Sequence, residues 1–128
     1  MSTERALGPF SVRAAAAEVA VFARETEAPG DRVPVTFPIR WLARPDLQAA
    51  AIDMIGDAHW VPIHESQSFD YHAPLALETD YAMDVTMKRE EEPSRIVVVA
   101  QVGAAGEPPR LDMEMILRII PLPAGQAA

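Results

Sequence analysis

Residues 45–55, PDLQAAAIDMI, constrain the fold of this chain more than any other segment. Apolar side chains recur there at the three- and four-residue spacing of a helical stripe and extend to a second side of the helix: Leu47, Ala50, Ala51, Ile52, Met54 and Ile55. Pro45 suits the first helical turn, and Gly56 suits the position just past the helix end. A helix with so little polar surface has to be covered by the rest of the chain.

After Gly56 the apolar residues follow the two-residue period of β-strands. Residues 59–71 are predicted to be extended, with a bulge or sheet edge at Pro62 and with an inner face formed by Trp60, Ile63, Phe69 and Tyr71. Further strands are predicted at residues 81–88, 96–102 and 111–119, joined by turns at residues 90–94 and 103–109. These strands are predicted to form an antiparallel sheet.

The amino-terminal part is predicted to be mostly helical. Residues 1–9 are expected to be a loose lead-in, Ser11 to cap a helix over residues 13–26, and the Phe10 region to offer a possible fifth strand. Residues 36–42 are predicted to form a short helical turn capped by Thr36, and residues 121–128 a loose tail.

This order of elements predicts one α+β domain over residues 1–128. In a hot-dog fold, a twisted antiparallel sheet wraps around one apolar helix. The alternative is a generic α+β sandwich with the helix on a flat sheet face. The wrapped arrangement accounts better for the scarcity of polar surface on residues 45–55.

Composition excludes several classes of function. The net charge of −8, with only 11 Lys and Arg residues and no basic cluster, argues against nucleic acid or an anionic membrane as the main partner. The chain has no cysteine, which excludes disulfides, thiolate nucleophiles and cysteine-bearing metal sites. Neither a signal sequence nor an apolar run long enough to span a bilayer is evident, so we expect a cytoplasmic protein.

Two segments resemble the MaoC-like dehydratase and (R)-specific enoyl-CoA hydratase family. Residues 61–75, VPIHESQSFDYHAPL, are similar to the segment after the central helix in the amino-terminal, often non-catalytic domains of that family. Residues 33–38, VPVTFP, resemble the family's Ala-Pro-Pro-Thr-Phe segment before the helix. The resemblance implies a hot-dog fold and a subunit that binds acyl-CoA or acyl-ACP without a cofactor.

The family's catalytic Asp and His lie in a loop of the form Gly-Asp-x-Asn-Pro-hydrophobic-His. Residues 30–36, GDRVPVT, keep the Gly, the Asp (Asp31) and the Pro, but Val33 replaces the Asn and Thr36 replaces the His. Threonine cannot serve as a general base near neutral pH. We therefore expect a binding or partner subunit, and whether the chain is itself an enzyme stays open.

Weak catalytic candidates are Asp31 and His64, and the resemblance implies a substrate-binding set of Thr36, Phe37, Trp41, His64 and His72. Because His64 and His72 are eight residues apart, a regular strand would place them on one side. Both histidines can equally well make structural hydrogen bonds. No metal site is predicted, because the sequence shows no convincing carboxylate at ligand spacing from either histidine.

Two alternative functions stay open. One is a self-sufficient hydratase that uses Asp31 and His64, and the other is a hot-dog thioesterase with Asp46 or Asp53 activating water. Because a single wrapped sheet leaves one edge unpaired, we also predict a homodimer, or a heterodimer with another hot-dog protein.

Overall fold

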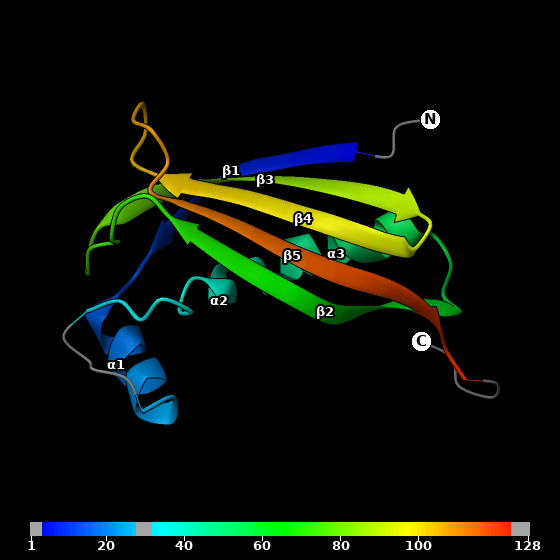
Figure 1. Ribbon diagram of the computed structural model, residues 1–128, viewed down its shortest axis with the longest axis horizontal. Coiled ribbons are helices and arrows are strands. Elements are labelled where there is room, and N and C mark those ends of the chain that lie inside the picture. Colours follow the sequence, from blue (N-terminus) through cyan, green and yellow to red (C-terminus); the bar gives the residue numbers. More distant parts are fainter. Residues whose placement is uncertain (1–3, 28–31, 124–128) are drawn as a thin grey trace.

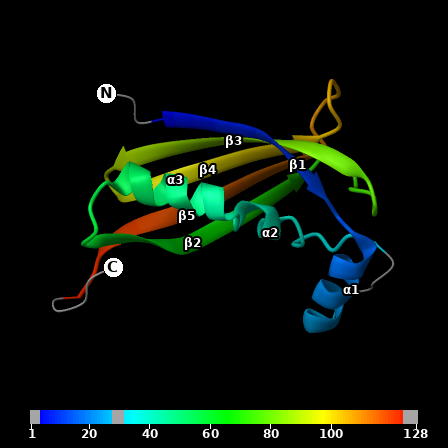
Figure 2. The same ribbon diagram turned by 180° about the vertical axis from the view of Figure 1, so that it is seen from behind.

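An antiparallel sheet of five strands forms one layer, and α3 lies along its inner face (Figures 1 and 2). The computed structural model describes residues 4–27 and 32–123. Along the chain the elements are β1 (Glu4–Arg13), α1 (Ala16–Glu25), α2 (Ile39–Leu42), α3 (Pro45–Ile55), β2 (Trp60–Tyr71), β3 (Asp80–Glu91), β4 (Ser94–Gly103) and β5 (Leu111–Pro121). The strand order is β1-β3-β4-β5-β2, and every pairing is antiparallel. The predicted α+β architecture is confirmed.

The core lies between α3 and the inner face of the sheet. One side of α3 is buried through Leu47, Ala50, Ala51 and Ile55. The sheet contributes alternate residues of its central strands, among them Met83, Val85, Met87, Ile96, Val98, Val102, Leu111 and Met113. Each large apolar side chain that leaves water in this way stabilises the fold by about 1.5–3 kcal/mol. The opposite side of α3 stays open to solvent, where Ile52 is 62% exposed.

Both ends of α3 follow the sequence prediction, and its carboxyl end gains a partner that the sequence did not show. Pro45 occupies the first turn, and Gly56 ends the helix with a left-handed φ of 71°. The Arg89 side chain on β3 donates hydrogen bonds to the carbonyl oxygens of Met54, at 2.8 Å, and Ile55, at 3.0 Å. A guanidinium at this position satisfies carbonyls that have no partner within the helix and complements the helix dipole.

The amino-terminal prediction was wrong in part. Residues 4–9, expected to be loose, belong to β1, which pairs with β3 on both sides of an irregularity between Leu7 and Phe10. Ser11 lies within this strand and caps no helix, because α1 begins only at Ala16 and has no side-chain cap. Pairing with a strand 67 to 84 residues away decides the conformation of this segment, and local sequence patterns do not reveal such a partner.

An aromatic cluster joins α1 to the segment before α3. The rings of Phe22 and Phe37 meet edge to face at a centroid distance of 5.3 Å, and those of Phe37 and Trp41 at 6.1 Å. The predicted helical turn is present as α2, but its side-chain cap is not, since the residue before α2 is Pro38 rather than Thr36. None of the helices described here is long and apolar enough to cross a membrane.

A bulge at Glu65 interrupts the pairing of β2 with β5. His64 pairs with Leu117, whereas Ser66 pairs with the adjacent Ile116, so one residue of β2 has no counterpart. Pro62 was predicted at a bulge or a sheet edge: it lies on the edge strand β2, and the bulge is three residues further along. Ile63, predicted on the inner face, pairs with the outward-facing Arg118 and is 46% exposed.

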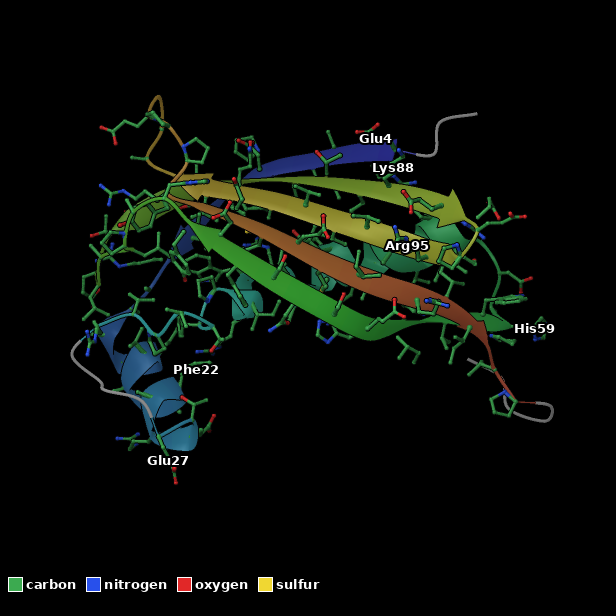
Figure 3. The ribbon with its side chains drawn as sticks, viewed as in Figure 1. Glu4, Phe22, Glu27, His59, Lys88 and Arg95 are labelled. Atoms are coloured by element: carbon green, nitrogen blue, oxygen red, sulfur yellow. The ribbon has the colours of Figure 1, made fainter. Side chains whose placement is uncertain are left out.

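The contact between Arg89 and α3 yields a stability prediction. Arg89→Ala leaves two helix carbonyls without their donor, and we expect it to lower the free energy of unfolding by about 1–3 kcal/mol. Lys88→Ala is the matched control. Lys88 is exposed at the outer side of the sheet, away from α3, and lies opposite Glu4 of β1 in the strand register (Figure 3). Urea unfolding followed by circular dichroism measures both, and equal losses would contradict a specific role for Arg89.

Candidate functional site

A groove of about 470 Å³ runs between α3 and the strands β2 and β5. Its apolar walls come from α2, α3 and the inner face of the sheet: Ile39, Leu42, Ala43, Leu47, Ala51, Ile52, Pro62, Met87, Val98, Met115 and Leu117. Ala43 and Ala51 on the helix side are too small to fill the groove. On the opposite wall, the flexible side chains of Met87 and Met115 can adapt to the shape of a bound molecule. Such a lining accepts an apolar chain rather than a charged one.

Three polar side chains line the groove: Gln48 from α3, and His64 and Gln67 from β2. In a regular strand, residues three apart point to opposite faces. The bulge at Glu65 resets this alternation, so that His64 and Gln67 both reach the groove. Within residues 4–27 and 32–123 no hydrogen-bond partner holds the His64 ring, which leaves it available to a bound molecule. The sequence analysis did not predict Gln67 as a groove residue, because its side chain is seen to face the groove only once the bulge is known.

Of the substrate-binding residues expected from the sequence, the groove contains only His64. Phe37 and Trp41 are buried in the aromatic cluster, and Thr36 is exposed on the turn before α2. Asp31 lies outside the described residues. His64 and His72 do not share a face of β2, in contrast to the prediction, because the bulge lies between them.

His72 lies just beyond β2, beside carboxylates of the outer sheet face. Its Nε2 atom is 2.8 Å from Oδ2 of Asp112 on β5. The hydrogen bond to Asp112 raises the pKa of His72 above its ordinary value of 6.5, and the negative charges of Asp70 and Asp112 act in the same direction. The neighbouring Tyr71 points the other way, where its hydroxyl donates to the carbonyl oxygen of Val35 at 2.8 Å and burial raises its pKa to about 12.

The two carboxylates considered for thioesterase chemistry lie outside the groove lining. Asp46 accepts a hydrogen bond from Arg44 at 3.2 Å, and Asp53 pairs with Arg5 of β1 at 2.9 Å. The groove therefore holds one histidine and two glutamines among its described residues, and no carboxylate.

Comparison with solved structures identifies the architecture. Similar structures include the HadBC (3R-hydroxyacyl-ACP dehydratase) complex from Mycobacterium tuberculosis, with a TM-score of 0.69 and 12% identity over 91% of this chain and 99% of that chain. Another is a hot-dog-like protein from Thermanaerovibrio acidaminovorans, with a TM-score of 0.63 and 14% identity over 94% and 82% of the two chains. A third is a 1,4-dihydroxy-2-naphthoyl-CoA thioesterase from Synechocystis, with a TM-score of 0.63 and 11% identity over 98% of this chain and 88% of that chain.

This chain has the hot-dog fold. No protein-family profile and no curated protein matches it in sequence. At the identities above, structural likeness establishes the fold alone, because one fold supports many functions. The function of this hot-dog protein therefore has to be inferred from its groove and from the sheet edge at β2.

The His72–Asp112 contact predicts a pH dependence of stability. Because folding raises the pKa of His72, its stabilising effect is fully present below pH 6.5 and is lost as pH rises through the folded-state pKa. The stability advantage of the natural chain over His72→Gln should therefore be larger at about pH 5.5 than at about pH 9. NMR titration of the His72 ring in the presence of a chelator checks the direction, and Asp112→Asn should bring its pKa back toward 6.5.

Proposed function

We propose that this chain is a MaoC-like hot-dog protein that binds acyl thioesters and acts as the binding or partner subunit of an enoyl-CoA hydratase or 3-hydroxyacyl dehydratase. The observation that carries this proposal is the apolar groove of about 470 Å³, with His64 and Gln67 on one side, beside the unpaired edge of β2. The acyl chain would occupy the apolar part, and the two polar side chains would face the thioester. Acyl-CoA and acyl-ACP present the same thioester chemistry to this groove.

The lining of the groove favours binding over catalysis by the chain alone. Hydration of a conjugated thioester needs a base for the water and an acid for the α-carbon. Among the described groove residues His64 is the only one with an ionisable side chain, and no carboxylate accompanies it. A second hot-dog chain would have to supply the missing acid–base pair.

The edge strand β2 supports the proposal of a partner. β5 pairs with one edge of β2, and no strand of the described residues lies along the other. Pairing with β2 of another copy or of a related chain would extend the sheet and bring that chain next to the groove. The partner chain would also lie close to the exposed Ile52 of α3 and could shield it from solvent. The HadBC structure is a complex, although its identity to this chain is only 12%.

Of the two alternative functions, only one has a specific observation behind it. A self-sufficient hydratase is favoured by the position of His64 in the groove. A thioesterase is favoured only by the shared fold, since Asp46 and Asp53 are held in ion pairs with Arg44 and Arg5. The proposal of a partner subunit accounts better for the absence of a carboxylate from the described groove lining.

Filling the groove tests ligand binding. Ala43→Trp places an indole at a groove-lining position that is exposed, so the fold should survive, and we expect affinity for a medium-chain acyl-CoA to fall by more than about tenfold. Ala49→Trp is the matched control, because Ala49 is an exposed α3 residue that does not line the groove. Isothermal titration calorimetry measures both, and unchanged affinity in Ala43→Trp would place the acyl chain elsewhere.

A turnover assay separates the three functions. With a crotonyl-CoA substrate, the purified chain alone should leave both the enoyl absorbance and the free-thiol level unchanged, because the acid–base pair is incomplete. Addition of a catalytic hot-dog partner should start absorbance loss. Absorbance loss by the chain alone that survives Thr36→Ala and His59→Ala but not His64→Ala would instead support a self-sufficient hydratase. Release of free thiol would support a thioesterase.

A further inference from the structure

We propose that Asp70, His72 and Asp112 form a binding site for a divalent transition-metal ion, with Zn²⁺ as the best fit, on the outer face of the sheet. This site is independent of the acyl groove, which lies on the inner face. The sequence analysis predicted no metal site, since Asp112 is 40 residues from His72 and only the fold brings them together.

Strand pairing determines the position of all three side chains. Asp70 of β2 lies directly opposite Asp112 of β5 in the antiparallel register. Asp112 stands between Leu111 and Met113, which are both buried in the core, so its side chain and that of Asp70 point outward. His72 follows Asp70 by two residues, and its backbone N–H donates to the carbonyl oxygen of Arg110 at 2.8 Å, which continues the pairing beyond β2.

The three side chains lie close enough to approach a common ion. One ligand atom from each of the three residues lies within 4.8 Å of the others. Atoms bound to one Zn²⁺ at about 2.0–2.2 Å cannot be further apart than twice that length, and lie about 3–4 Å apart in a tetrahedron. Binding would require rotations of the exposed Asp70 and His72 side chains to reach this spacing, and the 2.8 Å hydrogen bond between His72 and Asp112 would give way to the ion.

A second observation points to a cation at this place. Asp112 uses Oδ2 for His72, whereas its Oδ1 is shielded from solvent and has no hydrogen-bond donor among the described residues. The Asp112 side chain as a whole is 36% exposed, so only this one oxygen is cut off from solvent, and a shielded oxygen without a donor is uncommon in folded proteins. An ion bound between Asp70, His72 and Asp112 would supply the missing positive charge.

The donor set indicates the type of metal. Two carboxylates and one neutral imidazole carry a charge of −2, which balances one divalent ion. The imidazole favours zinc and its neighbours over Mg²⁺ and Ca²⁺, which prefer oxygen ligands only. Three protein ligands leave the fourth tetrahedral position to water. Because its ligands come from both strands, we expect the ion to stabilise the contact between the end of the edge strand β2 and β5. Because the sheet separates the site from the groove, we expect the ion to take no part in acyl chemistry.

Metal titration of the whole chain tests the proposal. After treatment with a chelator and its removal, calorimetry with ZnCl₂ should show one site per chain, and Co²⁺ should give the strong visible absorption of a four-coordinate ion. Asp70→Asn and His72→Gln should each weaken Zn²⁺ binding by at least about tenfold. Zn²⁺ should also raise the melting temperature of the natural chain and not that of these variants.

The matched control is Glu114→Gln, which removes an exposed outer-face carboxylate two residues from Asp112 but outside the cluster. It should bind Zn²⁺ like the natural chain. Far-UV circular dichroism verifies that Asp70→Asn, nearly the same shape as the original and at an exposed position, stays folded. The proposal is overturned if the natural chain binds no Zn²⁺, if His72→Gln binds it equally well, or if Mg²⁺ gives the same response, as attraction to a chain of charge −8 would.

Discussion

The packing of α3 against the inner face of the sheet is the contact on which the rest of the molecule depends. The helix has apolar residues on more than one side, and the sheet covers only the side that contains Leu47, Ala51 and Ile55. Arg89 ties the carboxyl end of the helix to β3 through its terminal carbonyls. The groove is the part of this interface that side chains leave unfilled, so the same packing that stabilises the fold also creates the candidate binding site.

A single extra residue in β2 decides what that site contains. Without the bulge at Glu65, His64 and Gln67 would point to opposite faces of the sheet. With it, both face the groove, while Asp70 and His72 emerge on the outer face beside Asp112. Bulges often re-aim side chains next to functional sites, and here one bulge serves both faces of an edge strand.

The two faces of the sheet offer different chemistry. The inner face is apolar and open near the unpaired edge of β2, which fits an acyl chain and a second hot-dog subunit. The outer face carries the ion pair of Arg118 with Glu65 and the cluster around His72. β2 contributes residues to both faces of the sheet. An ion bound at the carboxyl end of β2 would therefore also stabilise the strand with which a partner chain would pair.

The local pattern of the sequence was sufficient to predict α3 and the antiparallel strands β2 to β5, because helical and strand periodicities are properties of neighbouring residues. It did not predict the strand order, in which β2 pairs with β5. The resemblance to MaoC-like proteins also predicted that Thr36 stands where those proteins have a catalytic histidine. Only the tertiary structure decided that residues 4–9 belong to a strand, that His64 and His72 face opposite sides, and that Asp112 meets His72. Each of these depends on a partner strand distant in the chain, and periodicity within one segment cannot identify such a partner or its register.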